Sequence, residues 1–224
     1  MTIDFHAHIL PKCDHGSSSI DVSLKQLQLA KASGVDVVCA TSHFYPDKEN
    51  VEEFLERRDR CFADLSEARN QINDAPKVLR GAEILACVGL DRHPRLSDLC
   101  LEGTNLLLVE MPFSRWHTGL FEMMEGLACK KEFQTVMAHA DRYEPEDVER
   151  VIEMGIPLQL NVSSLASPFV KKHLKDWLER DLVVAFGSDI HGADNGYRNW
   201  DKARRRLKSQ WDSVMESTEG LIKG

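Results

Sequence analysis

The chain has 224 residues, a formal net charge of −8 and a hydrophobic content of 42%. This length fits one domain or at most two small ones, and the hydrophobic content supplies a large core, which argues against a disordered chain. The acidic balance argues against a protein that binds nucleic acid regardless of sequence, because such proteins carry basic surfaces.

No run of apolar residues approaches the roughly 20 residues that a membrane span needs. The first residues, "MTIDFHAH", carry charge and histidine where a signal peptide would have its apolar segment. The six cysteines form no C-x-x-C pair and several lie in apolar runs, so they are interpreted as reduced, mostly buried thiols. The sequence therefore predicts a cytoplasmic protein without a membrane span.

Short apolar runs rich in β-branched residues alternate with helix-like stretches. Strands are expected at residues 2–8, 35–41, 77–84, 105–111, 134–140, 157–162 and 182–188. Helices are expected at residues 23–34, 51–72 and 145–155, of which the first and the last end in glycine. This alternation is typical of a parallel sheet with crossover helices, and at this length it favours a closed or nearly closed α/β barrel. No linker interrupts the pattern, so residues 1–224 are expected to form a single domain.

Side chains that can bind metal lie near the carboxyl ends of six of the seven predicted strands. In parallel barrels that end carries the active site, because the βα loops meet there. Residues i and i+2 of a strand point to the same face, so His6 and His8 project together, and the same spacing relates Asp189 and His191. The first and last strands of a closed barrel are neighbours, so the two pairs are expected to converge.

Each of these residues, taken alone, has a structural alternative. A single His-x-His pair is often a coincidence or a surface pair, and Glu83 could face solvent. Glu110, His139 and Asp189 follow apolar runs, and a buried carboxylate is costly unless it is paired or binds a metal. The metal centre is predicted because all of these residues fall at strand ends together.

The candidate ligands are five histidines and four carboxylates, with no cysteine: His6, His8, Asp14, His43, Glu83, Glu110, His139, Asp189 and His191. This mixture suits Mn, Fe or Zn and argues against a structural zinc site built from thiolates. The set is too large for one ion, which takes roughly four to six ligands, so two or three divalent ions are expected. Two ions about 3.5–4 Å apart are the arrangement used to hydrolyse phosphate esters.

Two arginines follow the predicted ligands in βα loops. Arg142 comes three residues after His139, and Arg198 comes seven residues after His191. A guanidinium in such a loop could bind a phosphate in bidentate fashion. The alternative for each is an ordinary surface arginine.

The segments "DFHAHILPKCDHG", "ATSHFYP", "GAEIL", "LLLVEMPF", "MAHADRY" and "FGSDIH" occur in this order along the chain. Together they resemble the PHP (polymerase and histidinol phosphatase) superfamily over nearly the whole chain. The most similar branch is that of the bacterial manganese-dependent protein-tyrosine phosphatases of capsular and exopolysaccharide synthesis. The chain departs from that branch at His15, which stands where a second aspartate is usual, and at Ala140, which stands where proline is usual.

The resemblance implies a distorted (β/α)7 barrel with three metal ions. It implies that the first ion is held by His6, His8, Glu83 and Asp189, the second by Glu83, Glu110 and His139, and the third by Asp14, His43 and His191. It also implies that Arg142 contacts the phosphate of the substrate, with Arg198 as a looser match to a second arginine.

These observations predict a metal-dependent phosphoesterase that hydrolyses phosphomonoesters with metal-activated hydroxide. The expected substrate is phosphotyrosine on a protein tail, and His15 is a candidate for protonating the leaving oxygen. One alternative is a small-molecule phosphatase that acts on histidinol phosphate or a nucleotide. The others are a metal-dependent amidohydrolase, which usually needs a barrel lysine not found at the ends of predicted strands four to six, and a non-catalytic module.

Overall fold

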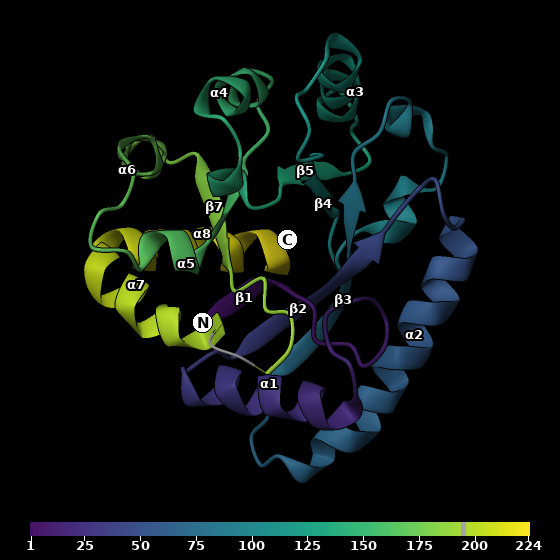
Figure 1. The fold of residues 1–224 in the computed structure, drawn as a ribbon, viewed down its shortest axis with the longest axis vertical. Helices are drawn as coiled ribbons and strands as arrows, with labels where there is room; N and C mark the ends of the chain where they lie inside the picture. Colours follow the sequence, from purple (N-terminus) through teal and green to yellow (C-terminus); the bar gives the residue numbers. More distant parts are fainter. Residues whose placement is uncertain (194–195) are drawn as a thin grey trace.

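The computed structural model describes residues 1–193 and 196–224 and contains seven parallel strands (Figure 1). The strands are β1 (Ile3–Ala7), β2 (Val37–Phe44), β3 (Lys77–Leu85), β4 (Leu106–Glu110), β5 (Gln134–Met137), β6 (Leu158–Asn161) and β7 (Val183–Gly187). Their order in the sheet is their order in the chain. This arrangement confirms the predicted alternation of strands and crossover helices.

The first and last strands meet just beyond their carboxyl ends. His8 forms a parallel bridge with His191, the backbone N–H of His8 donates to Ile190 O at 3.2 Å, and that of Asp189 donates to His6 O at 2.8 Å. The barrel is therefore nearly closed. It is also uneven, because β5 and β6 share a single residue pair, Met137 with Leu158. The predicted distorted (β/α)7 barrel is confirmed.

Helices surround the sheet (Figure 1). They are α1 (Ile20–Ala32), α2 (Val51–Ala68), α3 (Thr118–Ala128), α4 (Pro145–Glu153), α5 (Val162–Leu165), α6 (Lys172–Glu179), α7 (Trp200–Leu207) and α8 (Ser209–Lys223). Short 3-10 turns are η1 (Arg69–Gln71), η2 (Leu90–Arg92), η3 (Leu96–Leu99), η4 (Ala140–Arg142) and η5 (Gly196–Asn199). Within the described residues, no helix is long and apolar enough to cross a membrane.

All three predicted helices end earlier than expected, at Ala32, Ala68 and Glu153 instead of residues 34, 72 and 155. The first begins at Ile20 instead of residue 23, because Ser19 caps it by accepting a hydrogen bond from the Val22 N–H. The second begins as predicted, at a capping box in which Asn50 and Glu53 bond to each other's backbone N–H, but it ends at Ala68 and continues only as η1.

Five predicted strands end one to three residues earlier than expected, and in β5 and β7 a residue with positive φ follows the end. The strand predicted to reach residue 140 ends at Met137, because His139 adopts a positive φ of 31°. The last strand ends at Gly187 instead of residue 188, and Asp189 follows with a positive φ of 49°. Positive φ is uncommon for residues with a side chain and is incompatible with a continuing strand. The prediction that Asp189 and His191 lie on the last strand was therefore wrong, since both follow it.

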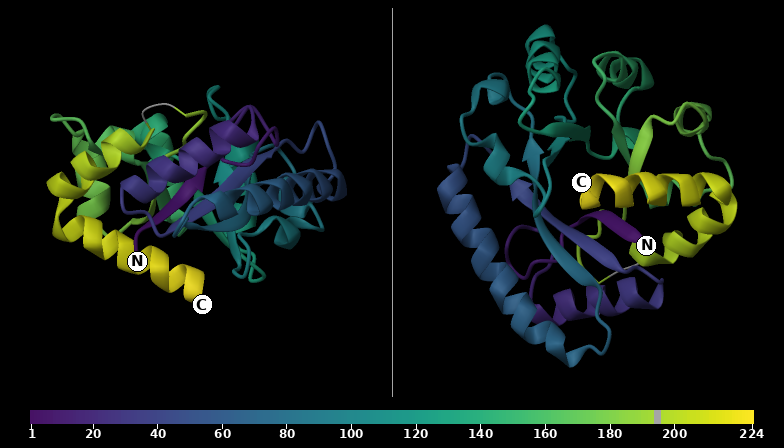
Figure 2. Two further views of the ribbon diagram at one scale, coloured as in Figure 1. Left: turned by 90° about the horizontal axis from the view of Figure 1, so that it is seen from below. Right: turned by 180° about the vertical axis from the view of Figure 1, so that it is seen from behind.

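The barrel interior is divided into an apolar floor and a polar mouth. The floor consists of small and aliphatic side chains near the amino ends of the strands, together with Phe5: Ile3, Phe5, Val37, Cys39, Leu79, Leu106, Leu108, Val136 and Ala185. Leu221 and Ile222 of α8 pack against this cluster, and Figure 2 shows α8 lying across the barrel beside the N-terminus. This helix covers one end of the barrel, and the metal-capable side chains lie at the other end.

Candidate metal centre

The metal-capable side chains reach the mouth because they continue the inward-facing rows of the apolar floor. On β2 the row runs from Cys39 through Thr41 to His43, and on β4 it runs from Leu108 to Glu110. In β1 the pairing register shifts between Asp4 and Ala7. Such an irregularity changes which side chains face inward, so Phe5 joins the floor while His6 and His8 join the mouth.

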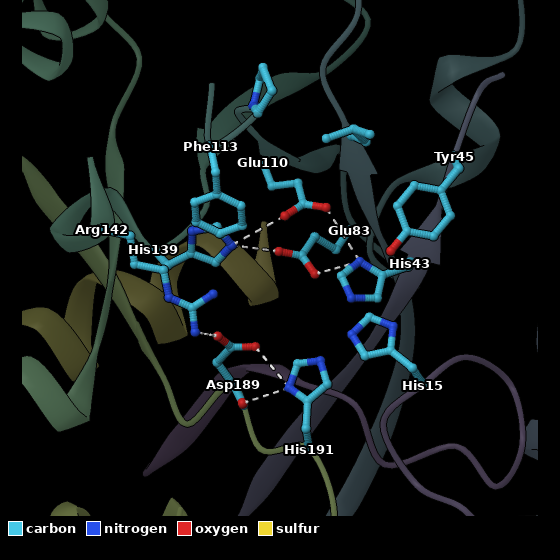
Figure 3. Close-up of a pocket in the computed structure, with 12 residues that line it drawn as sticks. His15, His43, Tyr45, Glu83, Glu110, Phe113, His139, Arg142, Asp189 and His191 are labelled. Carbon is cyan, nitrogen blue, oxygen red and sulfur yellow. Dashed lines mark hydrogen bonds and ion pairs between the residues drawn. The ribbon is translucent and has the colours of Figure 1, made fainter. Parts of the chain in front are cut away.

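The mouth contains a cavity of about 390 Å³ (Figure 3). Its lining residues are His15, His43, Tyr45, Glu83, Leu85, Glu110, Pro112, Phe113, His139, Arg142, Asp189 and His191. They come from the ends of β2, β3 and β4 and from the loops after β1, β2, β4, β5 and β7. Segments distant in the sequence thus supply one site.

Glu83 lies at the centre of the cluster. Its Oε2 is 3.2 Å from His6 Nε2, 3.1 Å from His8 Nε2 and 3.1 Å from His43 Nδ1. Its Oε1 is 2.8 Å from His139 Nε2. One carboxylate therefore faces four imidazoles, three through Oε2 and one through Oε1.

Two further carboxylates flank Glu83. Glu110 lies 3.4 Å from His43 Nδ1 and 3.6 Å from His139 Nε2, whereas Asp189 lies 3.6 Å from His6 Nε2 and 3.5 Å from His8 Nε2. The three carboxylates lie in a row at the base of the cavity, with Glu83 between the other two (Figure 3).

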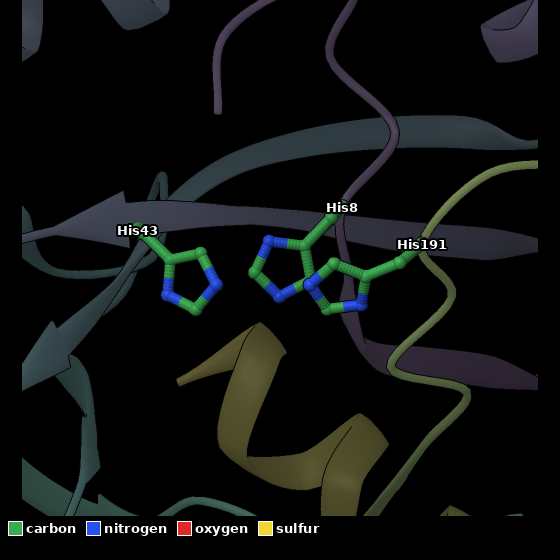
Figure 4. Close-up of side chains that lie close together, drawn as sticks. All are labelled: His8, His43 and His191. Carbon is green, nitrogen blue, oxygen red and sulfur yellow. The ribbon is translucent and has the colours of Figure 1, made fainter. Parts of the chain in front are cut away.

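Three groups of side chains have ligand atoms within 4.8 Å of one another. They are His8, His43 and His191 (Figure 4); His6, His8 and Asp189; and His43, Glu83 and Glu110. These groups overlap the three predicted ligand sets, but they place His8 where Asp14 was expected and His43 where His139 was expected.

The cluster contains buried polar atoms that have no hydrogen-bond partner among the described residues. They are both ring nitrogens of His43, Oε2 of Glu83 and Nδ1 of His139. His43 Nδ1 and Glu83 Oε2 lie 3.1 Å apart, but not in hydrogen-bonding geometry. Unpaired buried polar groups are costly, and a bound cation would accept their lone pairs. Imidazole and carboxylate donors without thiolate fit divalent Mn, Fe or Zn. The residues present therefore fit a group of divalent cations.

The charge balance of the cluster keeps its carboxylates ionised. Burial alone would raise the pKa of Glu83, but His6 and His139 hold that pKa well below its usual range. Burial also opposes ionisation of Asp189, yet His6, His8 and Arg142 lower the pKa of this carboxyl. Glu83 and Asp189 are therefore ionised at neutral pH.

The histidines respond in opposite directions to their surroundings. Burial would lower the pKa of His139, but Glu110 and Glu83 raise it to about 9. Burial and the neighbouring His8 lower the pKa of His191 to about 4. His191 is therefore neutral at pH 7 and keeps a lone pair, whereas His139 must release a proton before it can bind a cation.

Asp14 holds the loop after β1 in place. Its Oδ2 accepts hydrogen bonds from His8 Nδ1 at 2.9 Å and from the His43 N–H at 3.0 Å, and its Oδ1 accepts one from the Gly16 N–H at 2.9 Å. A carboxylate on the outer nitrogen of a ligand histidine fixes the orientation of that ring. Direct metal binding by Asp14 stays a prediction.

Two residues of β6 that the sequence analysis missed orient the cluster. Gln159 Oε1 accepts from the His139 N–H at 2.7 Å and lies 3.1 Å from His6 Nδ1. Asn161 Nδ2 donates to Asp189 Oδ2 at 3.1 Å. The i, i+2 spacing of these buried amides in "LQLN" was the available signal, since β6 was the one predicted strand without a metal-capable end.

The two predicted arginines differ in position. Arg142 lies on η4 at the cavity rim, is 39% exposed and is ion-paired through Nη2 with Asp189 Oδ2. Arg198 lies on η5, is exposed, and is not among the described residues that line the cavity. The structure brings Arg142 to the cluster but not Arg198.

His15 extends the imidazole cluster toward solvent. Its ring stacks on that of His43 at 4.5 Å between centroids and on that of His191 at 4.8 Å. Burial and the neighbouring His43 lower the pKa of His15. The exposed position of this ring leaves it accessible to a ligand in the cavity.

The model of the capsular polysaccharide synthesis family CpsB/CapC matches residues 2–218. The chain belongs to the CpsB/CapC family. The tyrosine-protein phosphatase CpsB of Streptococcus pneumoniae is 28% identical over 218 residues, which span 86% of this CpsB/CapC chain and 84% of that protein. Membership confirms the resemblance that the ordered motifs indicated.

Solved structures share the barrel. One comes from a study of YwqE from Bacillus subtilis and CpsB from Streptococcus pneumoniae, described as unique metal-dependent tyrosine phosphatases. It matches this CpsB/CapC chain with a TM-score of 0.81 at 24% identity and covers 99% of this chain and 94% of its own. A putative histidinol phosphatase from Listeria monocytogenes matches with a TM-score of 0.51 at 13% identity, covering 93% and 99%. These likenesses establish the fold.

Proposed function

We propose that this chain is a metal-dependent phosphatase that hydrolyses phosphomonoesters, with phosphotyrosine on a protein as its substrate. The observation that carries the proposal is the centre of the cluster, where Glu83 faces four imidazoles and buried donor atoms lack partners. Family membership and the named activity of the Streptococcus pneumoniae relative support it.

The predicted ligands would hold two or three ions, with manganese as the proposed native metal and iron or zinc as the alternatives. When bound, such ions activate water and neutralise charge on the phosphoryl oxygens. Asp14 and Gln159 orient the ligand histidines, which restricts the cluster to one geometry.

Arg142 is proposed to bind the phosphate. Its guanidinium is partly exposed at the cavity rim, and its ion pair with Asp189 holds it beside the cluster. It can therefore add a bidentate contact to an incoming anion. His15 is proposed to give a proton to the leaving oxygen, because it is an exposed imidazole of the cavity that stands outside the three ligand groups. Arg198 is kept as a weaker candidate for substrate binding.

All seven strands build one barrel, which supports a single domain over residues 1–224. The six cysteines are free, which supports the proposed cytoplasmic location, since cytoplasmic proteins keep their thiols reduced.

The function is tested with protein purified without a histidine tag and supplied with manganese. A phosphotyrosine peptide, histidinol phosphate and a nucleotide monophosphate are compared by kcat/KM, and the metal content is measured on the same samples. Preference for the peptide, together with bound manganese, is the expected result. Faster turnover of histidinol phosphate would favour the small-molecule alternative, and no hydrolysis of any ester would contradict the proposal.

A further inference from the structure

The cavity lining combines two kinds of side chain. Eight residues are ionisable at or beside the cluster: His15, His43, Glu83, Glu110, His139, Arg142, Asp189 and His191. The other four are Leu85, Pro112, Tyr45 and Phe113. These four are not among the predicted metal ligands, so metal binding does not explain their presence in the cavity.

The two aromatic rings, Phe113 and Tyr45, lie on opposite sides of the cluster around Glu83. Phe113 stacks over His139 with 6.2 Å between ring centroids and 12° between planes, and Tyr45 stacks over His43 at 5.3 Å and 17°. His139 and His43 in turn contact different oxygens of Glu83, at 2.8 and 3.1 Å. The aromatic rings therefore form two opposite walls of the cavity, with Glu83 and Glu110 between them (Figure 3).

Neither ring position is explained by the protein core. Phe113 is 71% exposed in the segment between β4 and α3, although burial of a phenylalanine ring is favourable. Tyr45 is only half-buried, and its ring is held by His43 and by Lys48, whose Nζ lies 4.1 Å from the ring centroid. Two aromatic rings that are partly or largely exposed and line one cavity indicate a ligand with an apolar part.

We infer that Phe113 and Tyr45 form a cleft that holds the aromatic ring of an aryl phosphate. The anionic group of that ligand then faces Arg142 and the cluster around Glu83. This inference rests on the proposed function and assigns the preference for aryl over alkyl phosphoesters to two side chains that bind no metal. Offset or edge-to-face packing of the ligand ring against either wall supplies the discrimination. An alkyl phosphate has no ring for the cleft and gains only the contacts of its anionic group.

The test compares phenylphosphonate with methylphosphonate, which carry the same anionic group and are not phosphate esters. Their dissociation constants for the manganese-loaded protein are measured by calorimetry. The ratio of the two constants removes the contribution of the ions and of Arg142. In the unaltered protein, phenylphosphonate binds more tightly, and Phe113→Ala or Tyr45→Ala reduces that ratio by about three- to tenfold, the effect of one aromatic pair.

Phe169→Ala is the matched control, because Phe169 is 89% exposed and does not line the described cavity. This variant keeps the ratio of the unaltered protein. If Phe113→Ala also keeps that ratio, or weakens both phosphonates equally, the cleft is refuted even when the protein hydrolyses phosphotyrosine. A reduced ratio in a protein that hydrolyses no ester supports the cleft and refutes the proposed function, so the two conclusions fail separately.

Discussion

Glu83 is the central carboxylate of the site, because its two oxygens contact four imidazoles. Glu83→Gln keeps its shape and removes its charge. We expect the variant to lose bound metal and at least about 100-fold in kcat/KM toward a phosphotyrosine peptide, since loss of a ligand exceeds the 10–100-fold cost of losing an orienting group. Metal analysis of the purified variant checks the first effect and steady-state kinetics the second. Full metal content with unchanged kinetics would contradict the central role of Glu83.

Gln159 tests the orienting groups separately. Gln159→Leu removes the acceptor for the His139 N–H and His6 Nδ1 without removing a ligand atom. We expect metal affinity or activity to fall by about 10–100-fold, less than in Glu83→Gln, with activity partly restored by excess manganese. Titration of activity against manganese concentration measures this. An unchanged titration curve would show that the ring orientation of His6 does not depend on Gln159.

Tyr197 stabilises the buried Asp4 beneath the cluster. Its hydroxyl donates to Asp4 Oδ2 at 2.6 Å, and the Ser188 N–H donates to Oδ1 at 2.8 Å. Burial raises the pKa of Asp4 despite these hydrogen bonds. An acid with a raised pKa in the folded state reduces stability as the pH rises from the unfolded pKa to the folded pKa, and the cost is constant above that range.

Tyr197→Phe removes a donor that favours the charged form of Asp4, so the pKa of Asp4 rises further. We expect a loss of about 1.5–3 kcal/mol in the free energy of unfolding at pH 7, and a smaller loss at pH 4. Urea unfolding at both pH values, with chelator present throughout, measures the difference between variant and parent. An equal loss at both pH values would show that Asp4 charge is not involved.

Most of the candidate ligands could be predicted from sequence because they lie at strand ends or shortly after them, where composition changes from apolar to ionisable. Gln159 and Asn161 could not be recognised in this way, because amides at a strand end have no chemistry of their own and acquire a role only from the groups they contact. Phe113 and Tyr45 were missed for a related reason. The sequence pattern predicts that an aromatic residue after a strand packs in the core. Only the structure shows that these two rings are accessible and line the cavity.

At the scale of elements, β7 packs closely against β1 and β6 at Gly187. A Cβ on Gly187 would lie 2.6 Å from His6 Cβ and 2.8 Å from Gln159 Nε2. Gly187→Ala is therefore expected to destabilise the fold by about 1–3 kcal/mol. The control is Gly220→Ala in α8, where a Cβ meets nothing within 4 Å and a gain of up to about 1 kcal/mol is expected. Denaturant unfolding compares them, and equal stabilities would contradict the close packing.

The elements also show where sequence patterns are insufficient. Strand order and the approximate positions of all seven strands followed from the alternation of apolar runs. The register shift in β1 between Asp4 and Ala7 did not, because it depends on the pairing with β2 and leaves no mark in the composition. The early ends of β5 and β7 are likewise set by the positive φ at His139 and Asp189, which the fold imposes on residues that do not favour it.

At the scale of the whole molecule, the ionisable cluster occupies one end of a barrel whose other end is apolar. Buried carboxylates and imidazoles are tolerated best when cations balance them, so ion binding is expected to stabilise the folded state. Free manganese at about 100 times its dissociation constant should add about 2.7 kcal/mol for each independent site. Thermal unfolding with EDTA and with manganese measures the shift, and Glu83→Gln should respond much less. Identical midpoints in the two conditions would contradict a metal centre in the mouth.

The bridge between His8 and His191 also affects how the protein is made. The amino-terminal histidines leave the ribosome long before the segment that completes their surroundings has been synthesised. A nascent or prematurely terminated chain therefore exposes half of a chelating site with no barrel around it. The full set of candidate ligands exists only after residues 189–191 have been synthesised and have packed against β1, so products truncated before residue 189 are expected to be inactive and prone to capture the wrong ion.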